Sequence, residues 1–153
     1  MNYYLLIVCL SISISVNSQI KNHNMTTLKS LTPNIMVKSV NKTLDYYTHK
    51  LGFKIIDTNP EQGEYDWGYV MLDQVGLMFQ EENSLKNEYK ELESMTVGAA
   101  LTLYIRVKNI HHYYNQISKK VTVVKPINKT FYGTHEFAII DNNGINLTFS
   151  ETP

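Results

Sequence analysis

HEFAIIDNNGINLTFSE, residues 135–151, reads as two short apolar strands joined by a turn that contains Asn-Gly. Its second half resembles the earlier run VGLMFQE, which begins at Val75, seventy positions before Ile145. The two runs share a leucine, a phenylalanine and a glutamate at matching places without a gap. A duplicated module would keep this offset elsewhere in the chain, whereas a chance similarity would not.

A second pair of segments repeats at the same offset. LTPNIMVKSV, from Leu31, matches LTLYIRVKNI, from Leu101, at Leu, Thr, Ile, Val and Lys. At this offset Trp67 also falls opposite Phe137. A unit of this length that occurs only twice is too large for a solenoid repeat. The sequence therefore predicts one domain made of two similar halves.

Length and charge suit a single globular domain. The chain has 153 residues and a formal net charge of zero, and a domain of this size buries about two-thirds of the surface that its unfolded chain exposes. Lys and Arg are balanced by Asp and Glu without a basic run, so nucleic acid is not an expected partner. The domain, residues 31–151, is predicted to comprise a first module, a connection and a second module, over 31–81, 82–100 and 101–151.

The first residues belong to a different class of segment. LLIVCLSISISV, from Leu5, is an apolar run of signal-peptide length that is too short to span a membrane. We therefore expect a signal peptide over 1–18, a linker over 19–30, and export to the periplasm or the outside. The initial MNYY carries no Lys or Arg, so a cytoplasmic protein that starts at Met25 is the alternative. The one cysteine, Cys9, lies in this segment, so the mature chain is expected to have no thiol and no disulfide.

Each half is expected to contain a strand, a helix and three further strands, which is an α+β plan. The first helix has a cap at Ser39 or Asn41 and a left-handed stop at Gly52. A second helix is expected over about 109–119, and a short surface helix within SLKNEYKELE in the connection. The expected strands are LTPNIMV, FKIID, WGYVML and VGLMFQ in the first half and LTLYIRV, VTVVKPI, EFAII and INLTFS in the second.

Strand alternation assigns the side chains to two faces. The first face is apolar and should pack on the helices; it comprises Ile35, Val37, Leu77, Phe79, Leu103, Ile105, Val107, Leu147 and Phe149. The second face is semi-polar in both halves; it comprises Thr32, Asn34, Met36, Met78, Gln80, Thr102, Tyr104, Arg106, Asn146, Thr148 and Ser150. A semi-polar face is typical of the wall of a ligand-sized cleft, and a plain solvent-facing surface is the alternative.

At these residues the chain resembles the vicinal-oxygen-chelate superfamily, which contains glyoxalase I, the extradiol dioxygenases and the bleomycin resistance proteins. The resemblance covers 31–151 and is carried by NIMVKSVNKTLDYYTHKLGFKII near the start and YGTHEFAIIDNNGINLTF near the end. It implies two βαβββ modules whose strands curl into a partly closed mixed barrel around a cleft. Resistance-type relatives form dimers, often by exchanging the first strand across a proline hinge, and Pro33 matches that place. A homodimer with each cleft built from both chains is therefore expected.

In the metal-dependent members of the superfamily, metal ligands lie on the first and last strands of each module. Those positions fall here on Thr32, Met78, Thr102 and Thr148. Three hydroxyls and one thioether are poor ligands for nickel, zinc or iron, so no metal and no other cofactor is expected. The lyase and dioxygenase mechanisms, which use the ion to polarise vicinal oxygens, lose their main component. The sequence therefore argues against an enzyme.

The sequence is closest to the bleomycin-resistance branch, in which the fold sequesters a ligand. The leading hypothesis is a metal-free protein that holds a small molecule in the cleft. A glyoxalase-type lyase or dioxygenase with a relocated metal site is the second hypothesis, and a structural or interaction module is the third. The expected ligand contacts are Asn34, Met36, Trp67, Tyr69, Met78, Gln80, Tyr104, Arg106, His135 and Thr148.

Two of these residues have an alternative role, and a third has an expected position in the cleft. Trp67 is either ligand surface or part of the core. Arg106, the one cation on the inferred cleft face, either binds an anionic group or forms an ion pair with Glu136 or Asp141. His135 is placed at the rim of the cleft, on the opposite side of its strand from Glu136.

Overall fold

The computed structural model describes residues 29–98 and 101–152. Leu31–Pro153 forms one compact unit of the chain. The predicted signal peptide over 1–18 and the alternative start at Met25 lie outside the described residues, so export stays a prediction. None of the helices in the described ranges is both long enough and apolar enough to cross a membrane.

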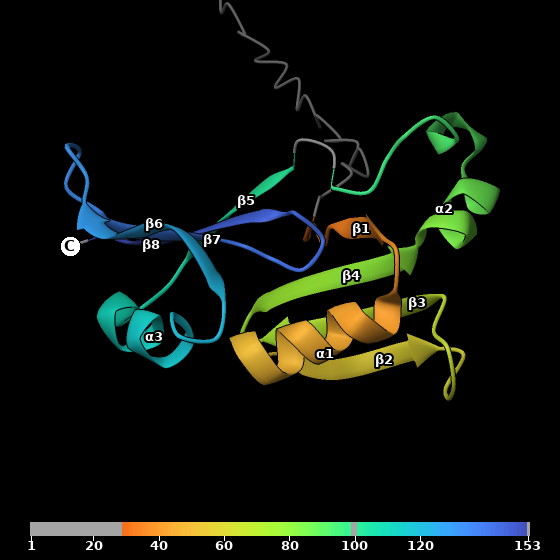
Figure 1. Ribbon diagram of the computed structural model, residues 1–153, viewed down its shortest axis with the longest axis horizontal. Coiled ribbons are helices and arrows are strands. Elements are labelled where there is room, and N and C mark those ends of the chain that lie inside the picture. The colour runs from red at the N-terminus through yellow and green to blue at the C-terminus, as the bar shows by residue number, and fades with distance from the viewer. Residues whose placement is uncertain (1–28, 99–100, 153) are drawn as a thin grey trace, which may run out of the picture. The chain divides into compact units, whose positions relative to one another are not determined.

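Both modules have the order of strand, helix and three strands that the sequence predicts, so the α+β class is confirmed (Figure 1). The first module contains β1 (Asn34–Val37), α1 (Val40–Leu51), β2 (Lys54–Asn59), β3 (Trp67–Leu72) and β4 (Val75–Glu81). The second contains β5 (Thr102–Arg106), α3 (Ile110–Ile117), β6 (Thr122–Lys129), β7 (His135–Ile140) and β8 (Asn146–Glu151). The connection holds α2 (Glu82–Glu88) and a short 3-10 helix, η1 (Lys90–Leu92).

The ends of α1 follow from local chemistry. Ser39 is the N-cap, and its hydroxyl accepts a hydrogen bond from Lys42 N at 3.3 Å. Gly52 ends the helix with φ of 84°, a conformation that a residue without Cβ adopts at little cost. The helix lies close against the first sheet, since a Cβ added at Gly68 would stand 2.9 Å from Leu44 Cδ1. Figure 1 shows α1 running along β2, β3 and β4.

The strands form two separate four-stranded sheets. Their orders are β1-β4-β3-β2 in the first sheet and β5-β8-β7-β6 in the second. In each sheet the first and last strands of the module are parallel neighbours, and the other neighbours are antiparallel. Within the described part of the chain no strand of one sheet pairs with a strand of the other, so the two sheets do not close into the partly closed barrel that the resemblance implies.

One hydrophobic core serves both modules. The predicted apolar face is confirmed, because six of its members are buried and Leu103, Ile105 and Val107 pack partly buried against them. Aromatic rings connect the layers, with 4.7 Å between the ring centres of Tyr47 and Phe79. The fully buried side chains that fill the centre are Tyr47, Phe79, Phe137, Phe149, Leu44, Leu51, Ile110, Ile139, Ile145, Leu147, Val37 and Val40.

Polar bonds join the two modules at the edge of this core. Asn143 Nδ2, in the turn between β7 and β8, donates to Thr43 Oγ1 of α1 at 2.9 Å. Tyr113 Oη of α3 donates to the carbonyl of Leu51, at the end of α1, at 3.0 Å. These bonds and the shared core hold the helix-facing sides of both sheets toward the same interior.

Candidate ligand-binding site

Each sheet has an open face, which is the face directed away from the core and helices. The open face of the first sheet brings together six of the predicted ligand contacts: Asn34, Met36, Trp67, Tyr69, Met78 and Gln80. The register explains this, because Trp67 pairs with Gln80 and Tyr69 with Met78. Trp67 is half-buried there with its ring 6.5 Å from that of Tyr69, so it is not part of the core.

A polar chain crosses the open face of the first sheet. Asn34 Nδ2 donates to Gln80 Oε1 at 2.7 Å, and Gln80 Nε2 donates to Glu88 Oε2 at 2.9 Å and to Ser84 Oγ at 3.2 Å. Ser84 and Glu88 belong to α2, so this helix covers the end of β4. Gln80 is buried with both ends of its amide satisfied, which makes it a positioning residue for Asn34.

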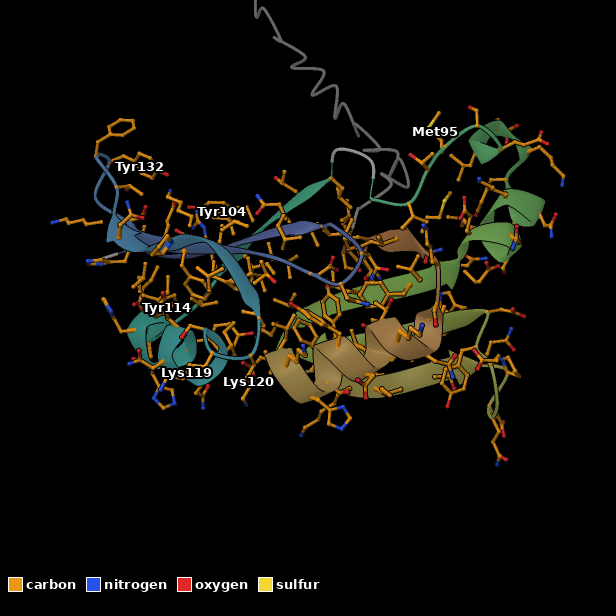
Figure 2. All side chains as sticks on the ribbon, viewed as in Figure 1. Met95, Tyr104, Tyr114, Lys119, Lys120 and Tyr132 are labelled. Carbon is orange, nitrogen blue, oxygen red and sulfur yellow. The ribbon has the colours of Figure 1, made fainter. Side chains whose placement is uncertain are left out.

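The open face of the second sheet carries Tyr104, Arg106 and Thr148, as predicted. Tyr104 pairs with Thr148, and Arg106 with Ser150, on neighbouring parallel strands. Figure 2 shows Tyr104 and Tyr132 on one side of this sheet and Tyr114, from α3, on the other. The Tyr104 side chain is 54% exposed and thus presents an aromatic surface to solvent.

His135 lies on the opposite face of β7 from this set. It alternates with Glu136 and shares the helix-facing side with the buried Phe137 and Ile139. Its ring packs edge-on against His111 of α3, with 5.2 Å between ring centres. His135 therefore does not share an open face with the other expected contacts, and its role at the rim of a cleft stays a prediction.

Glu136 lies on the open face of the second sheet, where the repeat in the sequence does not place it. The seventy-residue offset holds for β1 with β5 and for β4 with β8, but not for β3 with β7. Trp67 pairs with Gln80, whereas Ser150, seventy positions after Gln80, pairs with Glu136. Glu136 rather than Phe137 therefore corresponds to Trp67. The reason is turn length, since two residues separate the last pair of β3 and β4 and five separate the last pair of β7 and β8.

Four hydroxyls converge on one oxygen of Glu136. Its Oε1 accepts from Tyr104 Oη at 2.7 Å and from Tyr132 Oη at 2.9 Å. Thr134 Oγ1 and Ser150 Oγ lie at 3.0 Å and 3.3 Å from the same oxygen. Burial acts to raise the pKa of the Glu136 carboxyl, but the hydrogen bonds and the nearby Lys125 ammonium outweigh burial and hold that pKa below its ordinary value. Glu136 is therefore an anion at neutral pH.

Tyr104 remains protonated in this arrangement. Its bond to Ser150, at 2.6 Å, acts to lower the pKa of Tyr104, while the Glu136 carboxylate and burial act to raise it, and the net direction is upward. A protonated phenol beside an ionised carboxylate is a donor–acceptor pair that orients side chains. Proton transfer at neutral pH requires a group whose pKa is near 7. The pKa of Glu136 is shifted down and that of Tyr104 is shifted up, so both move away from 7.

Arg106 forms no ion pair among the described residues, so the predicted alternative of an internal partner is not found. Glu136 has Lys125 as its ionic neighbour, with 3.6 Å between Nζ and Oε2. Asp141 accepts the Tyr47 hydroxyl on the far side of the sheet, in the core. Arg106 itself is exposed at the end of β5. Its guanidinium is available to a molecule that arrives from solvent.

A shallow surface depression lies elsewhere, beside the start of α3. It is lined by Asn109, His111, His112 and Glu151, none of which was a predicted ligand contact. Glu151 has a structural task there, because its two oxygens accept from Asn109 N at 2.6 Å and Ile110 N at 3.1 Å and thereby cap the helix. This depression is separate from the open faces.

The two open faces do not face one another. Both sheets bury their other side in the same core, so each open face is turned away from it. The described chain therefore contributes two walls but does not close a cleft between them. A cleft of the kind the sequence predicts would need an opposite wall for each.

The residues at the inherited metal positions do not fit a divalent transition metal. Thr102 and Thr148 lie on the second sheet and Met78 on the first, while Thr32 precedes β1. Hydroxyl and thioether groups are weak ligands for zinc, nickel or iron. Across residues 29–98 and 101–152, no three His, Cys, Asp or Glu side chains are grouped as metal ligands.

The modules, the strand orders and the sequence patterns define one class of protein. The chain belongs to the Glyoxalase/Bleomycin resistance protein/Dioxygenase superfamily, whose family model matches residues 27–149. A comparison with curated protein sequences found no match.

Several solved structures share the fold. TioX from Micromonospora sp. ML1 is 13% identical with a TM-score of 0.66, over 82% of this chain and 99% of that chain. A bleomycin resistance determinant encoded on the transposon Tn5 is 16% identical with a TM-score of 0.61, over 82% and 98%. A bleomycin-binding protein from Streptomyces verticillus, complexed with copper(II)-bleomycin, is 17% identical with a TM-score of 0.58, over 84% and 100%. At these identities the similarities show the fold alone.

Proposed function

We propose that this protein binds and sequesters a small molecule on its open faces without a metal ion, in the manner of the bleomycin-resistance branch. The observation that carries the proposal is the free guanidinium of Arg106 next to the ordered Tyr104–Ser150–Glu136 network. Tyr104 offers an aromatic surface, Arg106 a charge and Ser150 a hydroxyl, and these groups are held on strands rather than on loops. Structural neighbours that bind bleomycin support a ligand-binding role.

Binding is a better account of this network than catalysis. A general base for neutral pH needs a pKa near 7, and the pKa of Glu136 is lowered while that of Tyr104 is raised. The inherited metal positions hold hydroxyls and a thioether, which do not polarise a substrate oxygen. A lyase or dioxygenase with a relocated metal site remains the second candidate, and metal content distinguishes it from the first.

The proposal includes a homodimer in which each cleft has walls from both chains. The open faces of a single chain do not oppose each other, so a second copy would supply the missing wall. Charge supports such an arrangement: the first module has four Lys and Arg against seven Asp and Glu, and the second has six against three. The modules thus carry net charges of −3 and +3, and the first module of one copy attracts the second module of another.

An exposed aromatic residue also supports the dimer. Phe131, in the turn between β6 and β7, is 100% exposed, which is unusual for a large apolar side chain. The turn is well ordered by bonds between Thr130 and Thr134, including Thr130 N to Thr134 O at 2.8 Å. The backbone that carries Phe131 is therefore held in place, and association would bury this exposed ring.

Native mass spectrometry of protein purified without chelator, and without denaturation, tests the proposal. We expect a dimer that carries an organic molecule and no metal. About one metal ion per chain would favour the enzyme hypothesis instead. A protein that never acquires a ligand, and whose melting temperature no metabolite mixture raises, would favour the structural module.

A further inference from the structure

The two oxygens of Glu136 have unequal surroundings. Oε1 has all four hydroxyl oxygens within 3.3 Å, so it is fully supplied with donors. Oε2 accepts no hydrogen bond from the described residues. The side chain as a whole is only 3% exposed. A buried carboxylate in this condition retains one strong, directed acceptor site.

Lys125 is the one cation within ion-pair range of Glu136 in the part of the chain that the structure describes. Its Nζ stands 3.6 Å from Oε2, whereas a charge-assisted N–H···O bond measures about 2.7–2.9 Å. The Lys125 side chain is 46% exposed and lies where the β6–β7 register shifts. A half-exposed lysine at this distance contributes little stability and moves aside easily. Lys125 is thus a weak partner for a strong acceptor.

We propose that Glu136 Oε2 binds a protonated amine of the ligand, and that Lys125 holds this place until the ligand displaces it. The inference rests on the proposed function and names the ligand class for that site. A molecule from solvent can reach this side of the sheet, because Tyr104 and Tyr132, whose hydroxyls bond to Glu136, are 54% and 57% exposed.

The register indicates what else the ligand carries. Arg106 and Glu136 both pair with Ser150, so the three residues form one row across β5, β8 and β7. With about 4.8 Å between neighbouring strands, the backbones of Arg106 and Glu136 are about 10 Å apart. The row presents a cation at one end and an anion at the other. An amphoteric molecule, with an amine for Glu136 and an anionic group for Arg106, satisfies both.

The test uses three probes of equal chain length: 6-aminohexanoate, hexane-1,6-diamine and hexanedioate. Binding is followed by NMR titration of the full protein, with the resonances of Tyr104 and Tyr132 as reporters. We expect both amines to bind at this site and the amino acid to bind more tightly than the diamine. Amine binding should weaken about ten-fold or more in Glu136→Gln, because a charge-assisted bond is lost.

Lys125→Gln is the decisive variant, because it changes an exposed residue and leaves the hydroxyl network intact. It removes a competitor, so it should strengthen binding of the diamine. Weaker diamine binding in Lys125→Gln, or unchanged binding in Glu136→Gln, would overturn the inference. The same holds if neither amine shifts the tyrosine resonances. Should hexanedioate bind through Arg106 while the amines do not, the inference fails and the proposed ligand-binding function stands.

Discussion

Tyr47 Oη donates a hydrogen bond of 2.9 Å to Asp141 Oδ2 inside the core that the two modules share, although 94 positions separate them in the chain. Burial and the Asp141 carboxylate raise the pKa of Tyr47 well above its ordinary value, so the phenol remains a donor. The other Asp141 oxygen accepts from Asn143 N and Ile145 N, both at 2.8 Å. One buried carboxylate thus orders the turn between β7 and β8 and attaches it to α1.

Replacing Tyr47 by Phe should destabilise the fold measurably. The change leaves a buried carboxylate oxygen without its donor, which costs about 1–3 kcal/mol of unfolding free energy. Urea unfolding followed by circular dichroism measures this loss. Tyr46→Phe is the control, because the Tyr46 hydroxyl is 3.4 Å from its acceptor, the carbonyl of Ile140, and its loss should be smaller. Equal losses in the two variants would contradict the role given to Asp141.

Acidification should destabilise the protein through Glu136. The pKa of this carboxyl is lower in the folded protein than the ordinary value of 4.5, so the ionised form favours folding. This contribution is complete above the ordinary value and is lost as pH falls through the lower folded value. Melting temperatures between about pH 6 and pH 3 should therefore fall less steeply in Glu136→Gln than in the parent protein. Glu91→Gln, at an exposed position of η1, is the control. Its melting temperature should fall with pH as steeply as that of the parent protein.

Arg106→Met should weaken ligand binding without loss of the fold. A charge-assisted contact contributes about 1.5–3 kcal/mol, so affinity for an anionic ligand should fall about ten- to a hundred-fold. Calorimetric titration measures the affinity, and thermal melting checks stability. Lys108→Met removes an exposed cation just beyond β5 and should leave affinity unchanged. A large fall in melting temperature with unchanged affinity would make Arg106 structural.

Purified protein should contain no stoichiometric zinc, nickel, iron or manganese. The physical reason is the donor set of Thr32, Met78, Thr102 and Thr148, which lacks an imidazole or a carboxylate. Elemental analysis of protein prepared without chelator checks this. A content of about one ion per chain would contradict the metal-free proposal and direct attention to the enzyme hypothesis.

Sedimentation velocity should show a dimer that weakens as salt is added. Opposite charges on the two modules favour association, and salt screens them over about 8 Å at physiological ionic strength. Phe131→Ser should weaken the dimer further, because it removes an apolar side chain that is fully exposed in the single chain. Tyr89→Ser alters another exposed aromatic residue, in the connection, and serves as the control. A salt-independent monomer at micromolar concentration would rule the dimer out.

Periodicity and repeats in the sequence were sufficient to predict the modules, the helix cap at Ser39 or Asn41 and the apolar face. These features depend on contacts close in sequence or on alternation along one strand, such as that of Ile35 and Val37. Both kinds of pattern can be read from one amino-acid sequence. The separation of the two sheets depends on how the modules pack through α1 and the β7–β8 turn, which local patterns do not encode.

The site was predicted in part for the same reason. Alternation predicted Tyr104 and Arg106 on the open face, but the ungapped repeat predicted Phe137, and not Glu136, opposite Trp67. The only sequence signal was the longer turn that follows β7, whose Asn-Gly pair sits within five residues rather than two. The convergence of Tyr132 and Thr134 on that carboxylate depends on a hairpin turn and has no periodic signature.

The odd number of residues in the turn between β7 and β8 has a consequence for how such a protein acquires new chemistry. In a pleated strand, lengthening the turn by an odd number of residues exchanges the two sets of side chains between inside and outside. A tryptophan position in one module thereby corresponds to a carboxylate position in the other, while each interior keeps its apolar filling. Two modules with the same order of strands and helix can in this way acquire different open faces through a change in the length of one turn.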